Sequence, residues 1–291
     1  MSNRRTRVTR HLHALVGERH PEGDPKALAD CARYLAQQFA DCGWTTTRQP
    51  FRALGKTYRN ILAIKNPSGH RKDHAAPILI GAHYDTVINS PGADDNASAL
   101  AVLLEVAYHL KRTTLKGPVW LAAFCLEEQG LLGSQAFASR LKRTHQQLAG
   151  TIILECVGYA CHDEGSQRIP TGVPLAVPSV GNFLAIIGNE ESRPLVTAIE
   201  RSAARSVPTL KTLGLAVPGR GMTLPNVRRS DHAAFWDEGF QAVMLTDTAN
   251  FRNPHYHQPT DTIDTLNLTF LEGVVDTVVA SVKEIAGCQR P

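Results

Sequence analysis

Acidic and imidazole side chains gather where the apolar runs of this 291-residue chain come to an end. They are His83 with Asp85, Asp94 with Asp95, Glu127 with Glu128, Glu155, and His257 with Asp261. Taken singly, each has an ordinary explanation as a solvated loop residue. Several carboxylates crowded together without arginine are costly to bury unless a cation compensates them, and two divalent ions would do so. Their joint placement therefore predicts a metal site.

The segment GAHYDT brings an imidazole and a carboxylate to the same side of a strand. Side chains alternate along a strand with a period of two, so His83 and Asp85 are expected to share a face. One ring nitrogen of His83 can then bind a metal ion while Asp85 accepts the proton of the other nitrogen.

The segment PGADDNASAL offers two carboxylates in a turn rich in Pro and Gly. Asp94 and Asp95 stand there just before a predicted helix, whose start Asn96 or Ser98 can cap. A helix cap alone would need only one aspartate, so the pair indicates metal binding.

Two adjacent glutamates follow an apolar strand in CLEEQGLLGS, and their side chains leave the chain in different directions. One of Glu127 and Glu128 can bind metal while the other stays free, as proton transfer beside a metal-held water requires. Considered alone, the pair also fits two exposed glutamates at a helix N-terminus, where the helix dipole favours them.

Two further segments offer ligands. Glu155 interrupts the apolar run TIILECVGY, and a carboxylate in so hydrophobic a strand needs a partner, for which metal is the economical choice. The segment NPHYHQPTDT supplies two imidazoles, His255 and His257. Both could share a face, so the residue pattern does not choose between them.

The hydrophobic pattern predicts a scaffold that brings these strand ends together. Apolar residues at helical spacing predict a helix over 24–39, and 45–64 is expected to form two extended segments around Gly55. Apolar runs then alternate with helical patterns such as 97–110 and 194–204. The runs are PILIGAHYDT, VWLAAFCLE, TIILECVGY, FLAIIGN and QAVMLTD. This alternation is typical of a mostly parallel sheet with helices on both faces.

Two long irregular segments, 160–182 and 217–229, are rich in Pro and Gly. Loops of that length in an α/β domain are usually functional, and these are expected at the edge of the sheet where ligands bind. No boundary signal supports a second domain.

The composition is that of a soluble globular protein, with 43% hydrophobic residues, 20% charged residues and a net charge of +4. Residues 1–20 lack the apolar core of a secretory signal, and nowhere do about 18 uncharged apolar residues follow one another. We therefore expect a cytoplasmic protein with no membrane partner. Reduced thiols are expected, with a bridge between Cys156 and Cys161 as the alternative. The basic cluster over 4–10 predicts a solvated helix start, and no module typical of nucleic-acid binding accompanies it.

The motifs together resemble the co-catalytic zinc exopeptidases typified by bacterial leucyl aminopeptidases, whose fold is shared with glutaminyl-peptide cyclases. GAHYDT, PGADDNAS, LEEQGLLGS, RSDHAAFW and YHQPTDT occur in that family's order and at roughly its spacing, over about residues 60–286. The resemblance implies a three-layer α/β/α sandwich with a central mixed, mostly parallel sheet of about eight strands. It would be a single domain over 1–291, with the N-terminal helical segment 1–43 packed on it.

The resemblance also implies roles for the residues that match its motifs. His83 and Glu128 would each contact one or other metal ion, Asp95 would bridge both ions, and Glu127 would be the general base. The remaining ligands would be Glu155 and His257. Residues expected to support the site are Asp85, Asp94, Asp231 and His232. The best-known aminopeptidases of the family carry aspartate in place of Glu155. Glutamate is still an oxygen ligand, so two zinc ions are expected. The longer side chain leaves a site with one zinc ion as the alternative.

The walls of the substrate pocket are placed only by analogy with the family. Leu245, Phe251 and Tyr256 flank the last ligand and could line an apolar pocket for the first side chain of the substrate, with ordinary loop packing as the alternative. An arginine near these segments could instead hold a substrate carboxylate. The candidates are Arg228, Arg229 and Arg252.

The predicted reaction is hydrolysis of an N-terminal peptide bond by a zinc-bound water, with a peptide or aminoacyl compound as substrate. Three alternatives stay open from the sequence. They are a glutaminyl-peptide cyclotransferase with one zinc, a small-molecule amidase or carboxypeptidase of the same fold, and a non-catalytic binding module. The last would be expected to have lost ligands or the base. The oligomeric state is not predicted.

Overall fold

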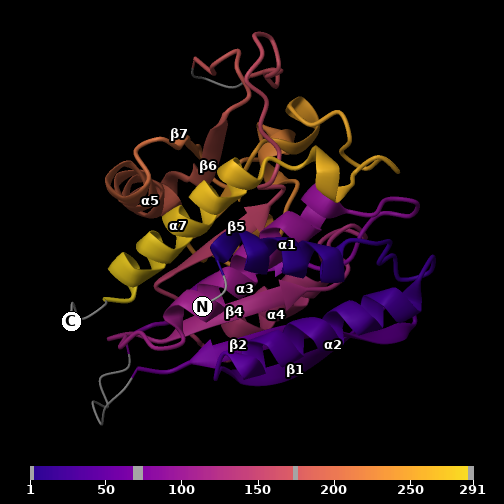
Figure 1. The fold of residues 1–291 in the computed structure, drawn as a ribbon. Coiled ribbons are helices and arrows are strands. Elements are labelled where there is room, and N and C mark those ends of the chain that lie inside the picture. The colour runs from indigo at the N-terminus through magenta and orange to yellow at the C-terminus, as the bar shows by residue number, and fades with distance from the viewer. Residues whose placement is uncertain (1–2, 68–74, 173–175, 288–291) are drawn as a thin grey trace.

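One eight-stranded sheet runs through the centre of the computed structural model, which describes residues 3–67, 75–172 and 176–287 (Figure 1). The strands are β1 (Thr45–Ala53), β2 (Lys56–Lys65), β3 (Ile78–His83), β4 (Val119–Phe124), β5 (Gly150–Glu155), β6 (Phe183–Asn189), β7 (Lys211–Val217) and β8 (Ala242–Thr246). Their order across the sheet is β1-β2-β4-β3-β5-β8-β6-β7. The pairs β3/β4, β3/β5, β5/β8 and β6/β7 are parallel, and the pairs β1/β2, β2/β4 and β6/β8 are antiparallel. The expected mixed, mostly parallel sheet is confirmed.

Helices cover both faces of the sheet. They are α1 (Arg4–Leu15), α2 (Pro25–Asp41), α3 (Ala99–Leu110), α4 (Leu132–Arg143), α5 (Arg193–Ser206), α6 (His232–Asp237) and α7 (Leu268–Ile285). One core lies between the sheet and α2, α3, α5 and α7, with α1 packed against α3. A second core lies under α4 and α6 on the other face. The expected three-layer α/β/α arrangement is therefore confirmed.

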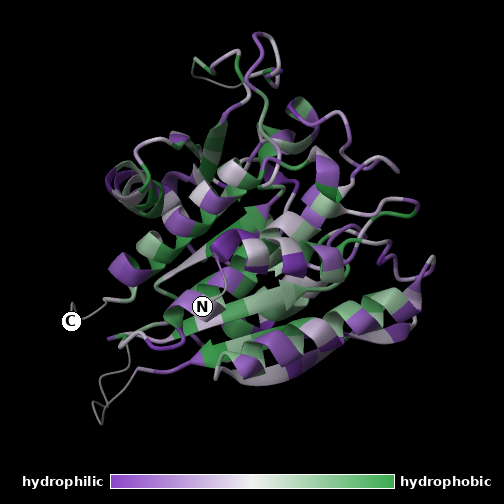
Figure 2. Ribbon diagram, in the orientation of Figure 1, coloured by the Kyte–Doolittle hydropathy of each residue, from purple (hydrophilic) through white to green (hydrophobic). Residues whose placement is uncertain are grey.

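Helix α2 illustrates how the hydrophobic spacing produces an element. Its buried side chains, from Leu28 to Phe39, recur every three or four residues and form one stripe toward the core. The Asp24 carboxylate caps its start by accepting a 2.8 Å hydrogen bond from the N–H of Ala27. Figure 2 shows the same division across the molecule, with mostly hydrophobic residues along the inner strands and many hydrophilic residues along the helices.

Two elements differ from the sequence pattern. Strand β7 lies outside the five apolar runs because it is the last strand of the sheet and most of its side chains are exposed or half-buried. Helix α3 begins at Ala99 and not at 97, because residues 93–98 form a wide turn in which Asp95 and Asn96 leave helical φ and ψ angles. A cis peptide bond joins these two residues.

The strand order brings the ends of four strands together at one edge of the sheet. Strands β4, β3, β5 and β8 are parallel neighbours, so their carboxyl ends meet at the same edge. The chain leaves β3 for β4 on one side and later returns to β5 on the other. Helix α3 lies on one face of the sheet and α4 on the other. Ligands of open α/β sheets bind at such a reversal of strand order.

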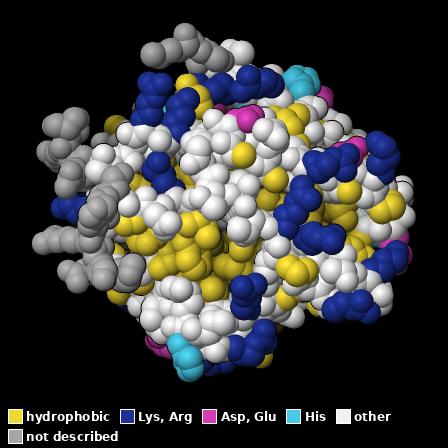
Figure 3. Space-filling view, turned by 90° about the horizontal axis from the view of Figure 1, so that it is seen from below, with side chains coloured by type: hydrophobic (Ala, Val, Ile, Leu, Met, Phe, Trp, Pro, Cys, Tyr) yellow, Lys and Arg dark blue, Asp and Glu magenta, His cyan; other side chains and the backbone are white. Residues whose placement is uncertain are grey.

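Charged side chains lie along β1, the first strand in the order across the sheet. Strand β1 is unpaired on one side, and its Arg48 and Arg52 are exposed. Figure 3 looks from below at the side where α2 and β1 lie in Figure 1, and lysine and arginine clearly outnumber acidic side chains there. Charge on an edge strand discourages pairing with another chain. In the described ranges, no helix is both long enough and apolar enough to span a membrane.

Candidate metal centre

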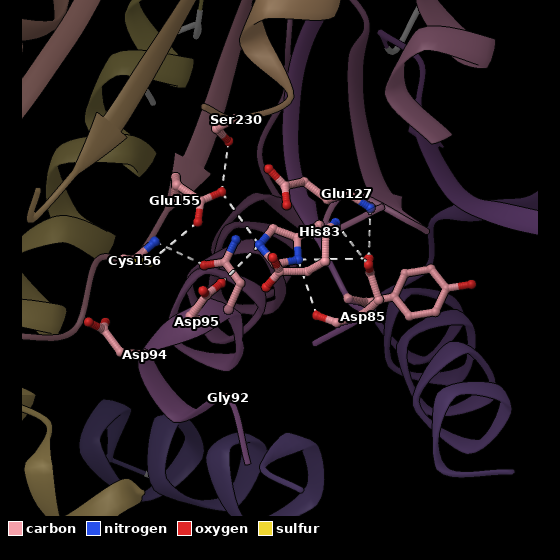
Figure 4. A network of polar contacts seen from close by, with 12 residues as sticks. His83, Asp85, Gly92, Asp94, Asp95, Glu127, Glu155, Cys156 and Ser230 are labelled. Carbon is pink, nitrogen blue, oxygen red and sulfur yellow. Dashed lines mark hydrogen bonds and ion pairs between the residues drawn. The ribbon is translucent and has the colours of Figure 1, made fainter. Parts of the chain in front are cut away.

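The carboxyl ends of β3, β4, β5 and β8 and the loops that follow bring together three overlapping groups of side chains that could hold a metal ion. They are His83 with Asp95 and Glu155, His83 with Glu127 and Glu128, and Asp95 with Glu128 and His257. Within each group the potential ligand atoms lie within 4.8 Å of one another. All six residues were singled out from the sequence. Figure 4 shows His83 at the centre, flanked by Asp95, Glu155 and Glu127.

Asp95 lies between the two imidazoles. Its Oδ1 is 3.1 Å from Nε2 of His83, and its Oδ2 is 3.0 Å from Nε2 of His257. On the first side, Oε2 of Glu155 lies 3.5 Å from Nε2 of His83. On the second side, Oε2 of Glu128 lies 3.4 Å from Nε2 of His257. One carboxylate thus joins two sets of ligands.

Several of these buried atoms have no hydrogen-bond partner among the described residues. They are Nε2 of both His83 and His257, Oδ1 of Asp95 and Oε1 of Glu128. Buried polar atoms without a partner need an explanation, and an ion coordinated by these nitrogens and oxygens supplies one. The field of the site agrees. Burial alone would lower the pKa of His257, but Asp95 and Glu128 raise this pKa to about 10, so a positive charge is strongly favoured. The residues therefore fit bound divalent metal.

His83 is held in the form that leaves Nε2 open. Its Nδ1–H donates a 3.1 Å hydrogen bond to the main-chain oxygen of Asp85, which fixes the proton on Nδ1. The Asp85 carboxylate is farther away, with Oδ1 at 3.8 Å from Nδ1. The strand alternation predicted that the Asp85 carboxylate accepts the Nδ1 proton of His83. The main-chain oxygen of Asp85 accepts this proton instead.

The Asp85 carboxylate instead fixes the turn that carries the two glutamates. It accepts hydrogen bonds of 3.1 Å and 3.2 Å from the N–H groups of Glu127 and Glu128. Burial raises the pKa of Glu127 well above its ordinary value; His83 opposes this rise, and the carboxylates of Glu155 and Glu128 add to it. The Glu127 carboxylate, 7% exposed as a residue, forms no hydrogen bond with the described side chains. It is thus buried, close to the ligands and uncommitted.

The turn that carries Asp95 is held from two sides. The Asp261 carboxylate accepts hydrogen bonds of 2.9 Å and 3.1 Å from the N–H groups of Asp94 and Asp95. Asn96 donates from Nδ2 to the main-chain oxygen of Leu154, and its Oδ1 accepts from the N–H of Cys156. The second pair of bonds ties the Asp95 turn to the end of β5, where Glu155 lies.

His257 comes from the loop after β8 and is covered by its neighbour. The Tyr256 ring stacks on it with centroids 3.8 Å apart and an interplanar angle of 16°. Arg229 donates to the Tyr256 hydroxyl at 3.2 Å. His255, in contrast, pairs its Nδ1 with the Thr260 hydroxyl and belongs to none of the three ligand groups.

Asp94 points away from the ligands, as Figure 4 shows. It accepts hydrogen bonds from the N–H of Gly158 at 2.8 Å and from Nδ2 of Asn253 at 2.7 Å. It also shares a buried contact with Asp247, and burial together with the mutual repulsion raises the pKa of Asp247 well above its ordinary value. The sequence analysis missed Asp247 and Asn253, although Asp247 follows an apolar run in the same way as the residues it did select.

Asp231 and His232, the acidic and the imidazole residue of the RSDHAAFW motif, have different surroundings. Asp231 is fully buried, and its charge contributes to raising the pKa of Glu127; burial raises its own pKa to about 7. His232 faces the core under α6, where Nε2–H donates 2.7 Å to the main-chain oxygen of Val227 and the ring meets Trp236 edge-on. Burial lowers the pKa of His232 to about 4. Asp231 therefore acts electrostatically on Glu127, whereas His232 is bonded to the main chain under α6.

An apolar cavity of about 110 Å³ lies near the end of β5. Thr246, which pairs with Glu155 across β5 and β8, lines this cavity. Phe251, Ile187 and Leu215 also line this cavity. The expectation for Leu245 is wrong. Its side chain is fully buried in the main core, since alternate residues of β8 face opposite sides of the sheet.

The three arginines near these segments are engaged differently. Arg228 pairs with both oxygens of Asp237 at 2.9 Å and 2.8 Å, and Arg252 is buried with its Nε donating to Gln167. Arg229 is exposed at the rim beside Tyr256. Arg228 is half-buried and Arg252 is buried, so Arg229 alone of the three is exposed. Cys156 and Cys161 are both free thiols, so the alternative disulfide is absent.

Comparisons with known proteins agree with these motifs. The sequence profile of Peptidase family M28 matches residues 60–282. YfbL of Escherichia coli, a protein described as uncharacterised, is 34% identical over 262 residues, which cover 85% of this chain and 77% of YfbL. Aminopeptidase YwaD of Bacillus subtilis is 29% identical over 239 residues, which cover 79% of this chain and 45% of YwaD. The chain thus spans less than half the length of YwaD.

Two solved structures share the fold. An aminopeptidase from Aneurinibacillus sp. strain AM-1 superposes with a TM-score of 0.73 at 18% identity, covering 99% of this chain and 94% of that one. Glutaminyl cyclase from Porphyromonas gingivalis gives a TM-score of 0.69 at 19% identity, covering 97% and 96%. At such identities the likeness establishes the fold alone. The match of the family profile to most of the sequence and the identity with YfbL show that this chain belongs to peptidase family M28.

Proposed function

We propose that this chain is a zinc-dependent aminopeptidase that hydrolyses the first amide bond of a peptide. The observation that carries the proposal is Asp95, whose two oxygens face His83 and His257 at 3.1 Å and 3.0 Å. Such a carboxylate suits two neighbouring ions. Membership of a peptidase family supports peptide hydrolysis, and the name of the relative YwaD supports the N-terminal bond.

The proposed ligands divide into two sets that share Asp95. His83 and Glu155 would hold one ion with it, and Glu128 and His257 would hold the other. When bound, zinc polarises the substrate carbonyl and lowers the pKa of water, so that water becomes a nucleophile at neutral pH. The longer side chain of Glu155, compared with aspartate, keeps an oxygen donor within reach of His83.

Glu127 is the proposed general base. Its carboxylate lies in one ligand group with His83 and Glu128 but is bound by no described side chain. Burial raises its pKa well above the ordinary value, so its ionised form is the stronger base. Glu127 would take a proton from the attacking water and deliver it to the leaving amine nitrogen.

The apolar cavity beside Glu155 supports a substrate whose first side chain is apolar. Phe251, Ile187 and Leu215 line it, and its 110 Å³ is of the order of one aliphatic side chain. Arg229 at the rim would favour acidic or carboxylate-bearing substrates instead. Rates on leucyl, glutamyl and N-acylated amino-acid substrates separate these preferences.

Glu127→Gln tests the mechanism because it keeps the size of the side chain and removes its basicity. The variant should keep its zinc content and its melting temperature, and lose about 10²–10⁴-fold in kcat on leucine anilide. Undiminished turnover would remove Glu127 as the base. A glutaminyl peptide belongs in the same panel, since release of ammonia with ring closure by the wild-type chain would identify a cyclase. The second ligand set, with Glu128 and His257, favours the hydrolase.

A further inference from the structure

A buried arginine outside all the motifs contacts the segments that carry proposed ligands. Arg19 stands between α1 and α2, is only 2% exposed, and donates its guanidinium hydrogen bonds to main-chain oxygens. Nε donates to Tyr84 at 2.9 Å, and Nη2 donates to Gly92 at 3.2 Å. Nη1 is shared by Leu15, Gly17 at 2.7 Å and Pro91 at 3.1 Å. None of the hydrogen bonds described for this guanidinium reaches a carboxylate.

Three of these acceptors, the main-chain oxygens of Tyr84, Pro91 and Gly92, belong to the two segments that carry proposed ligands. Tyr84 lies between His83 and Asp85, and Gly92 lies three residues before Asp95. The main chain near Arg19 adds further bonds to the same loops. The N–H of Arg19 donates to the Thr86 hydroxyl at 2.9 Å, and the N–H of Gly17 donates to the oxygen of Pro91 at 2.9 Å. The segment around Arg19 therefore joins the end of β3 to the turn that carries Asp95.

The loop that contains Gly92 packs closely against the Arg19 guanidinium. Gly92 has φ of 61°, and a Cβ placed on it would lie 2.9 Å from Nη2 of Arg19 and 2.3 Å from the main-chain oxygen of Asp95. Little space is therefore available for the Gly92 loop to move toward the guanidinium while the Arg19 side chain stays in place.

The charge of Arg19 matters as well as its hydrogen bonds. Burial lowers its pKa, while Asp85, Asp95 and Asp261 act in the opposite direction, so its positive charge faces the carboxylates of the site from behind. A neutral amide could satisfy some of the same carbonyl groups at less desolvation cost. A buried cation is justified here because it offsets part of the crowded negative charge.

We propose that Arg19 is a positioning residue of the metal centre, which fixes the His83 loop and the Asp95 turn in the spacing that lets both ligands converge on one ion. The inference rests on the proposed function for its metal. Arg19 would act through its main-chain contacts, without touching substrate or metal. Loss of Arg19 should therefore weaken zinc binding more than it weakens substrate binding.

The test compares zinc affinity of Arg19→Lys and Arg19→Gln with that of the wild-type chain, by competition with a chromophoric chelator. Supporting groups around metal ligands are worth about 10- to 100-fold in metal affinity, so Arg19→Gln should fall in that range. Arg19→Lys keeps the charge with fewer directed donors and should lose less. At saturating zinc, KM for a leucine substrate should stay near the wild-type value.

Arg7→Lys provides the matched control. Arg7 is also buried, and it pairs with Glu105 through bonds of 2.9 Å and 2.6 Å between α1 and α3. The Arg7→Lys variant should have a lower free energy of unfolding and an unchanged zinc affinity. Equal zinc affinity in Arg19→Gln and wild type would overturn the inference, as would an equal loss of zinc affinity in Arg7→Lys. Zinc binding by a wild-type chain without aminopeptidase activity would instead contradict the proposed function and leave the Arg19 comparison intact.

Discussion

The Ser230 hydroxyl donates a 2.7 Å hydrogen bond to Oε2 of Glu155. The same oxygen lies 3.5 Å from Nε2 of His83, so the bond holds it toward the proposed ligand group. Glutamate has one more rotatable bond than the aspartate of the best-known aminopeptidases, and this freedom must be restricted if the carboxylate is to serve as a ligand. Ser230, from the loop before α6, supplies the restriction.

Replacing Ser230 by alanine should weaken zinc binding at the set that contains Glu155 by about 10-fold, because the carboxylate loses its fixed orientation. Isothermal titration with zinc measures this affinity directly. Ser281→Ala is the control, since Ser281 is equally buried and donates 2.8 Å to the Thr277 oxygen in α7. Both variants should lose about 1 kcal/mol of folding free energy, and only the first should lose zinc affinity. Equal zinc affinity in both would show that Glu155 needs no such support.

Removal of zinc by a chelator should lower the melting temperature as well as abolish activity. The carboxylates of Asp95, Glu128 and Glu155 repel one another when no cation lies between them. A ligand present at 100 times its dissociation constant stabilises the fold by about 2.7 kcal/mol, and readdition of zinc should restore both properties. The number of zinc equivalents needed is equally informative. Two equivalents are expected, and full recovery with one would contradict the two-ion arrangement.

Much of the candidate site is predictable because buried parallel strands have a plain signature. An unbroken apolar run marks the strand, and the polar residue that ends it falls at the common edge of the sheet. His83 and Glu155 are the last residues of β3 and β5, so this rule locates both. The choice of His257 over His255 came from the family resemblance alone, because loop residues follow no strand period.

The misplaced or missed residues have physical reasons of their own. Asp85 lies beyond the end of β3, where side chains no longer alternate, so its carboxylate turns to the glutamate pair. Leu245 belongs to a strand covered on both faces, where burial does not reveal which face holds the pocket. Arg19 acts on main-chain oxygens from a segment without periodicity, and no sequence motif records such a contact.

Substitution of Gly92 by alanine should damage the metal centre through sterics. The added Cβ would lie 2.3 Å from the Asp95 oxygen and 2.5 Å from Cγ2 of Thr86, at a φ of 61°. The turn must shift, so weaker zinc binding and a lower melting temperature are expected. Gly55→Ala is the control, because Gly55 has φ of 71° with nothing within 4 Å of the added atom. It should cost only about 1–2 kcal/mol for the left-handed backbone, with zinc affinity unchanged.

His232 should make the folded state sensitive to mild acid. Burial lowers its pKa to about 4 from 6.5, so between these values the unfolded chain binds a proton that the folded chain does not. The contribution of His232 to stability is thus complete above pH 6.5 and declines as the pH falls toward 4; at pH 5.5 the loss is about 1 kcal/mol. Carboxylates with raised pKa values, such as Asp231, act in the opposite sense. The measurement is therefore a difference: unfolding free energies of wild type and His232→Gln at pH 7.5 and pH 5.5, at one zinc concentration. Wild type should lose about 1 kcal/mol more than the variant, and parallel losses would mean that His232 is protonated equally in both states.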